Sequence, residues 1–137
     1  MNPRLRAGLA AGAVALAGVA LLVARLGGGA PEAGWSPATE AARHVGERGT
    51  VCGEVASTRY APSVDGEPTF LNLERPYPDQ VFTAVIWGDD RPRFDRPPEA
   101  QFRDRRICVT GKIGVHRGTP QIIVRRPDQI EMVREDR

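Results

Sequence analysis

The stretch VTGKIGVHRGTPQIIV, residues 109–124, has the pattern of two β-strands joined by a short loop. In its first half Val109, Gly111 and Ile113 alternate with polar side chains, which is typical of a strand with one buried face. The segment VCGEV, residues 51–55, repeats the order apolar, x, glycine, x, apolar. Glycine inside a strand is favoured where the chain bends sharply. The two glycines therefore predict a small, strongly curved barrel rather than a flat sheet.

The other expected strands are short and are separated by turn residues. Ser36 as an N-cap and Pro37 at the first helical position predict a short helix over residues 37–45. The longest irregular link, residues 88–105, has at most one helical turn, near residues 99–102. The expected strands are residues 50–57, 69–73, 80–87, 106–115 and 121–124, with residues 129–133 closing the chain. This layout predicts an all-β fold, a five-stranded OB-fold barrel preceded by a short helix.

Residues 7–24 contain only Ala, Gly, Leu and Val. As a helix this segment would be ~27 Å long, close to the ~30 Å hydrocarbon core of a bilayer. Arg4 and Arg6 precede it, which favours a cytoplasmic N-terminus. The segment is therefore a retained transmembrane helix or a cleaved signal peptide, and both readings stay open.

The chain accordingly divides into three parts. We expect a hydrophobic anchor or signal over residues 1–26, a flexible linker over residues 27–35 and the OB-fold domain over residues 36–137. The expected location is the cytoplasmic membrane, with a single pass and the C-terminal domain on the extracytoplasmic side, or export of that domain.

The charge of the chain is unevenly distributed. The whole chain has a formal net charge of +2, but the part from Trp35 onward has 16 basic and 16 acidic residues. A domain without net charge has no global field that attracts a polyanion. This neutrality therefore argues against nucleic-acid binding and favours contacts with a protein or a small ligand.

Several segments in order carry a resemblance to a known family: V-x-G-x-V at 51–55, F-L-N-L at 70–73, F-T-A-V-I-W at 82–87, and residues 109–124. The chain resembles the OB-fold nucleic-acid-binding domains over about residues 50–132. It is most similar to the type found in the large subunit of exodeoxyribonuclease VII and in anticodon-binding domains of tRNA synthetases. Small exported bacterial OB-fold proteins described as DNA-binding also look similar.

The resemblance implies where a ligand binds. OB folds bind single strands on the outer face of their second and third strands, beside the loops that join strands one to two and four to five. If Leu71 and Leu73 point into the barrel, their neighbours point onto that face. The implied contacts are Arg59, Tyr60, Phe70, Asn72, His116 and Arg117. The alternative is that Phe70 is covered by the linker or the short helix, and that the arginines are ordinary loop residues.

No catalytic, metal or cofactor site is expected from the sequence. His44 and His116 are far apart, neither CxxC nor HExxH occurs, and Asp89-Asp90 fits a solvated turn. The sequence therefore predicts a non-enzymatic module that binds single-stranded nucleic acid, its other partner being the membrane through residues 7–24. The competing reading is an envelope protein that uses the barrel for protein or small-ligand contacts.

Cys52 and Cys108 are the two cysteines of the chain. Export to an oxidising compartment favours a disulfide between them. Antiparallel pairing of the first and fourth strands with Gly53 opposite Gly111 would instead place Cys52 beside Lys112, several residues from Cys108. A disulfide in another register and two separate buried thiols both remain open.

The orientation of the chain in the membrane can be tested through its flanking charges. Replacing Arg4 and Arg6 with glutamate should weaken or invert the orientation, because flanking positive charge sets it. Protease protection in spheroplasts measures the outcome. A wild-type domain that is protected on the cytoplasmic side would show the expected location to be wrong.

Overall fold

The structure, a computed structural model, describes residues 35–134. The expected N-terminal helix over residues 1–26 and all of the expected linker except Trp35 lie outside the described residues. Within residues 35–134 no helix is both long and apolar enough to cross a membrane. The elements are β1 (Trp35–Pro37), η1 (Ala38–His44), β2 (Arg48–Tyr60), β3 (Thr69–Leu73), β4 (Phe82–Ile86), η2 (Gly88–Arg93), α2 (Pro98–Gln101), β5 (Arg106–His116), β6 (Thr119–Ile123), η3 (Pro127–Gln129) and β7 (Ile130–Met132).

The described chain is mainly β. Its seven strands are paired in the order β1-β2-β3-β4-β6-β5-β7, and a further pairing joins β2 to β5. The strands β2, β3, β4, β6 and β5 therefore form a ring, in which only the β4–β6 contact is parallel. That contact has three residue pairs, so the result is a partly closed barrel. These five strands match the five expected from the sequence, although β4 is shorter than expected at both ends.

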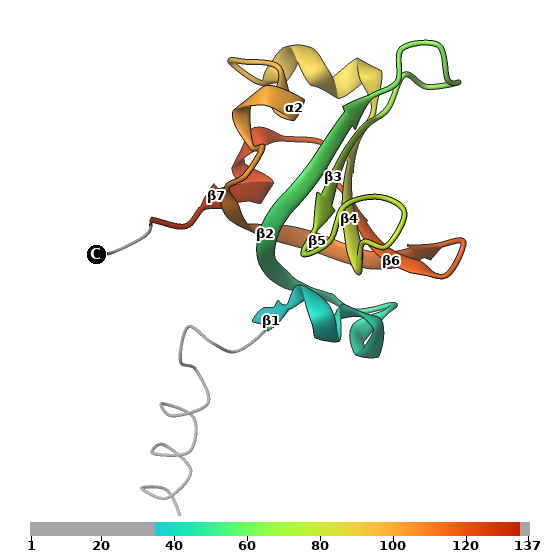
Figure 1. Cartoon of the computed structure of the whole chain (residues 1–137), viewed down its shortest axis with the longest axis vertical. Coiled ribbons are helices and arrows are strands. Elements are labelled where there is room, and N and C mark those ends of the chain that lie inside the picture. Colours follow the sequence, from blue (N-terminus) through green and yellow to red (C-terminus); the bar gives the residue numbers. More distant parts are fainter. Residues whose placement is uncertain (1–34, 135–137) are drawn as a thin grey trace, which may run out of the picture. The chain divides into compact units, whose positions relative to one another are not determined.

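The strand β2 is shared by two parts of the barrel (Figure 1). Residues 48–54 pair with β5, and residues 55–60 pair with β3 after an irregularity between Val55 and Ser57. Gly53 lies at this change of partner, where an added Cβ would be 2.7 Å from Glu74 Oε2, 3.1 Å from Ala38 Cβ and 3.2 Å from Leu73 Cδ2. On β5, a Cβ at Gly111 would be 2.7 Å from Ile122 Cγ2. Close packing inside the small barrel is therefore the reason for both glycines.

The beginning of the domain differs from the expectation. Ser36 is not a helix N-cap, because it belongs to β1 and pairs in parallel with Val51 of β2. Trp35, expected at the end of the linker, pairs with Thr50. The helix that follows is a 3₁₀ helix that buries Ala38 and Ala41 in the core.

Both ends of the barrel are covered by short helical elements. The helix η1 lies at one end, and the segment containing η2 and α2 crosses the other (Figure 1). In that crossing segment the rings of Phe94 and Phe102 meet edge to face with centroids 6.2 Å apart. Both rings belong to the same core as Leu71, Leu73 and Phe82. The core therefore fills the barrel from end to end.

The register of β2 and β5 differs from the one considered above. Gly53 faces Ile107, and Gly49 is the residue that faces Gly111. This shift places Cys52 directly opposite Cys108, with their Cα atoms 4.0 Å apart and their Sγ atoms bonded. The bond joins the two strands that close the ring, and it spans 56 residues of sequence.

The disulfide should contribute strongly to stability. Replacing Cys52 and Cys108 together by alanine should lower the free energy of unfolding by about 4 kcal/mol, because a bond across a loop of this length restricts the unfolded chain. Urea unfolding measures the difference. Mass spectrometry of protein alkylated without prior reduction should find neither cysteine modified, and a prior reduction step serves as the control. Two alkylated cysteines in the unreduced sample would rule out the bond.

Candidate nucleic-acid interface

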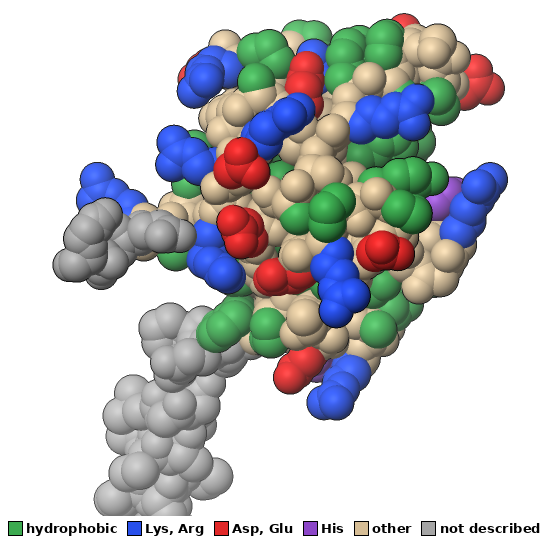
Figure 2. Space-filling view, viewed as in Figure 1, with side chains coloured by type: hydrophobic (Ala, Val, Ile, Leu, Met, Phe, Trp, Pro, Cys, Tyr) green, Lys and Arg blue, Asp and Glu red, His purple; other side chains and the backbone are tan. Residues whose placement is uncertain are grey.

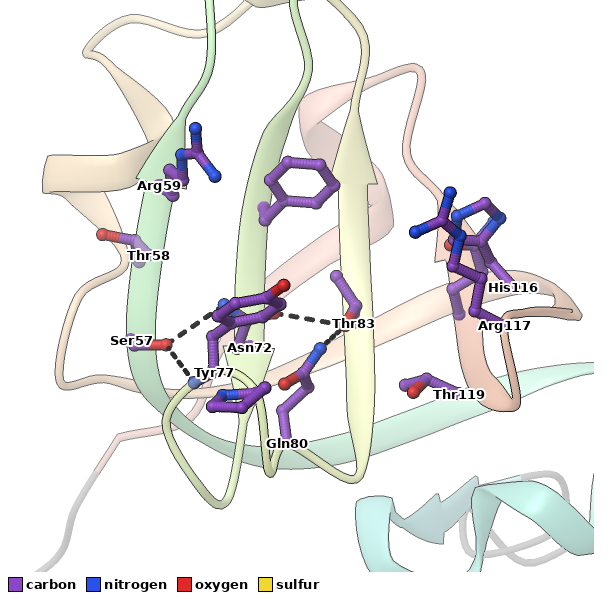
Figure 3. Close-up of a pocket in the computed structure, with 13 residues that line it drawn as sticks. Ser57, Thr58, Arg59, Asn72, Tyr77, Gln80, Thr83, His116, Arg117 and Thr119 are labelled. Atoms are coloured by element: carbon purple, nitrogen blue, oxygen red, sulfur yellow. Dashed lines mark hydrogen bonds between the residues drawn. The ribbon is translucent and has the colours of Figure 1, made fainter. Parts of the chain in front are cut away.

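A groove of about 590 Å³ lies on the outer face of β3 and β4. Its residues come from the second half of β2, from β3 and β4, from the loop between β3 and β4, and from the β5–β6 hairpin. Arg59 lies on one side of the groove, and His116 and Arg117 lie on the other (Figure 3). The groove thus brings together side chains that are nearly 60 residues apart in the sequence.

The floor of the groove is a row of polar residues linked by hydrogen bonds. Asn72, which is 3% exposed, donates from Nδ2 to Ser57 Oγ at 3.1 Å and accepts at Oδ1 from Thr83 Oγ1 at 3.2 Å. Thr83 Oγ1 in turn accepts from Gln80 Nε2 at 3.3 Å. Asn72 therefore lines the groove, as expected, but both polar atoms of its amide are already engaged inside the protein.

Two aromatic side chains line the groove above this floor. Leu71 and Leu73 are fully buried, so strand alternation turns Phe70 outward, and its ring is half-buried. Tyr77 comes from the loop between β3 and β4 and is 70% exposed. Its backbone N–H donates to Ser57 Oγ at 3.1 Å, which holds the loop against the floor. The sequence analysis missed Tyr77, although its position between Pro76 and Pro78 was the available signal.

The charged groups of the groove are all basic. Arg59 is the cross-strand partner of Phe70, and both side chains line the groove. Arg117 and Gly118 have φ values of 51° and 85° and form a two-residue turn between His116 and Thr119. Two left-handed residues in such a turn match the twist of a hairpin. These two arginines are the charged side chains of the lining, which also includes His116 but no Asp or Glu.

Tyr60 does not belong to this groove. It follows Arg59 on β2, and strand alternation turns it to the other side. There the Arg91 guanidinium lies over its ring, 3.5 Å from the centroid. The same guanidinium donates to Thr69 Oγ1 at 2.6 Å and to Glu99 Oε1 at 2.7 Å. Tyr60 therefore helps to attach the η2–α2 segment to the barrel and lies outside the groove lining.

The Arg91–Glu99 pair is partly buried, with side chains 18% and 23% exposed. Burial alone would raise the pKa of Glu99. The hydrogen bond from Arg91, a backbone hydrogen bond and the charges of Arg91 and Arg103 act in the opposite direction and outweigh it. The pKa of Glu99 therefore lies below its ordinary value, and the carboxylate stays charged beside Arg91.

Metal-ligating side chains do not gather within residues 35–134: no group of three His, Cys, Asp or Glu side chains there is placed to hold an ion. In the Asp89-Asp90 pair, Asp90 Oδ1 lies 3.5 Å from Arg93 Nε.

Comparisons with known proteins gave no match to a family model and none to a curated protein. The solved structures that are similar in part include the following two. A chain described as an aspartyl-tRNA synthetase from Leishmania major Friedlin is 18% identical with a TM-score of 0.46; the match covers 74% of this chain and 21% of that one. An OBody bound to hen egg-white lysozyme is 15% identical with a TM-score of 0.46. This match covers 69% of the present chain and 85% of the OBody chain. The chain thus matches about a fifth of the length of the synthetase.

The Arg91–Glu99 pair predicts how stability depends on pH. Replacing Glu99 by glutamine should lower the free energy of unfolding by about 1–3 kcal/mol at neutral pH, since a charged hydrogen bond is lost. A carboxylate whose pKa is lowered by folding stabilises the folded protein at pH values above its pKa in the unfolded chain, 4.5. This contribution is lost as the pH falls through the pKa of the folded state. The difference between variant and wild type should therefore shrink in acid.

Urea unfolding at neutral and acid pH measures this dependence. Asp128→Asn is the matched control, because Asp128 pairs with Arg126 where both side chains are exposed, and it should change stability little at either pH. A deficit of Glu99→Gln that stays constant across the acid range would contradict the assignment.

Proposed function

We propose that the domain is an OB-fold module that binds single-stranded nucleic acid along the groove and catalyses no reaction. The observation that carries the proposal is the composition of the groove: two aromatic rings and two arginines lie in one lining without a carboxylate. Base stacking on aromatic rings and arginine contacts to phosphates are the two interactions that bind single strands without sequence preference.

The position of the groove supports the OB assignment. In the ring of five strands, β3 and β4 are the second and third, and the β5–β6 turn joins the fourth to the fifth. OB folds bind their ligands on this face and beside this turn. The loop between β2 and β3, residues 61–68, adds no lining residue, so Arg59 at the end of β2 supplies that side of the groove.

The hydrogen bonds of the floor limit what the groove can recognise. Reading a base requires free donors and acceptors facing its edge. Those of Asn72 are engaged with Ser57 and Thr83, and Thr83 also accepts from Gln80. A bound strand would therefore be held mainly by stacking on Phe70 and Tyr77 and by its phosphates. We infer that Asn72 and Thr83 contribute little sequence preference.

The location of this activity rests on the N-terminal segment. We propose that residues 7–24 hold the domain at the outer face of the cytoplasmic membrane or direct its export. DNA outside the cytoplasm would then be the accessible ligand.

The volume of the groove favours a second candidate, an envelope protein that binds a small ligand or a protein segment. Sites for small molecules typically measure about 300–1,000 Å³, which includes the 590 Å³ found here. The absence of net charge from Trp35 onward also fits this class.

A fluorescence-anisotropy titration of the full chain in mild detergent with a labelled single-stranded oligonucleotide separates the two. Under the first proposal, binding is observed at low salt and weakens as salt increases. Phe70→Ala should weaken binding by about 1–3 kcal/mol by removing a stacking ring. Arg117→Ala should weaken it and also reduce the salt dependence. Arg43→Ala is the matched control, because Arg43 is exposed on η1 outside the groove.

Thermal unfolding accompanies the titration, and the midpoint of the Arg117 variant should remain close to that of wild type. A loss of ~3–5 kcal/mol of stability in Phe70→Ala would identify Phe70 as a core ring and remove it from the site. Absence of binding by the wild-type protein at low salt would exclude the nucleic-acid proposal and favour the second candidate.

A further inference from the structure

Neither packing nor backbone conformation within the described domain requires a glycine at position 114 in β5. A glycine within a strand weakens the strand, and it commonly marks a bend or the close approach of another chain or a ligand. The nearby Gly111 packs against Ile122 where β5 changes partner from β2 to β6. At Gly114, by contrast, φ is not positive, and an added Cβ would meet nothing within 4 Å. The space above this residue is open.

This open space continues the floor of the groove. The strand pairings form one row of direct neighbours across the ring: Ser57, Asn72, Thr83, Gln121 and Gly114. Directly paired residues in a sheet point to the same face. Because the first four residues line the groove, Gly114 extends its floor onto β5 without a side chain in the way.

Two basic residues lie beyond Gly114. Lys112 is two positions earlier on β5 and so points to the same face. Its direct neighbour across the strands is Arg48 of β2, and both residues are exposed. Like charges placed directly opposite each other destabilise a sheet. Within residues 35–134 neither forms an ion pair, and the nearby Glu47 carboxylate accepts from His44 Nδ1 at 3.0 Å.

We propose that a bound single strand leaves the groove across Gly114 and that Lys112 and Arg48 bind a further phosphate there. This inference rests on the proposed function and extends its site beyond the segment held between Arg59 and Arg117. An anionic ligand would relieve the repulsion between Lys112 and Arg48. The absence of a side chain at Gly114 lets the strand lie flat between the groove and this pair.

The extension predicts that affinity depends on oligonucleotide length. The probes are labelled oligothymidylates of about 4 and about 12 nucleotides, within the range of sites on single OB folds. The full chain in mild detergent should bind the longer probe more tightly. Replacing Arg48 and Lys112 together by glutamine should weaken binding of the longer probe and reduce its salt slope by about 0.7, the contribution of one lost single-strand phosphate contact. Binding of the shorter probe should not change.

Gly114→Val tests the path independently of charge. Valine suits a strand and finds open space here, so the thermal midpoint should be equal to or higher than that of wild type. Its side chain should weaken binding of the longer probe only. For the glutamine double variant, Arg106→Gln is the matched control, because Arg106 is exposed at the far end of the same face of β5.

The outcomes separate the extension from the function on which it rests. Loss of affinity for both probe lengths, or for neither, in the Arg48 and Lys112 double variant would overturn the extension. Failure of the wild-type protein to bind either probe would instead remove the proposed function. If Gly114→Val unfolds, the double variant alone decides the result.

Discussion

The strand β2 has to pair with β5 along its first half and with β3 along its second, and most other features follow from this constraint. Gly53 lies at the change of partner, where an added Cβ would be in tight contact with Ala38 and Leu73. The pairing with β5 fixes the register that brings Cys52 opposite Cys108. The pairing with β3 puts Ser57 and Arg59 beside the outer face of β3, where the groove lies. Closure of the barrel and construction of the groove therefore depend on the same strand.

The groove also shows how a sheet can be stable and leave a surface free for a ligand. Side chains on one face of a strand enter the core, where Leu71, Leu73 and Phe82 are fully buried. On the opposite face, the polar groups of Asn72 and Thr83 bond to one another and to their neighbours, so the floor costs little to desolvate. Aromatic and basic side chains are left to contact a ligand from the loops and strand ends. These parts of a fold tolerate variation best, which is why the site can differ between proteins that share the same barrel.

Features that follow from local patterns were accessible from the sequence. Alternation placed the strands and turned Phe70 outward, and the short hairpin placed His116 and Arg117 at one rim. Features that depend on register or on distant partners were not. The offset that pairs Cys52 with Cys108 is set by how β2 passes between two neighbours, which no local pattern encodes. Tyr60 looked like a loop aromatic, but its environment is decided by Arg91, which is about 30 residues away in sequence. Tyr77 belongs to a loop whose position depends on a backbone contact with Ser57.

The distribution of charge constrains how the domain would capture its ligand. Basic and acidic side chains are interspersed over the face shown in Figure 2, and the part from Trp35 onward is neutral as a whole. Long-range attraction of a polyanion is therefore weak, and association would not be strongly steered. Within the groove the balance is different, because Arg59, His116 and Arg117 face no carboxylate in the lining. With only a few phosphate contacts, the salt dependence of binding would be modest, and stacking on Phe70 and Tyr77 would supply much of the affinity. Under the proposed attachment to a membrane, slow capture would be offset by a high local concentration of the groove at that surface.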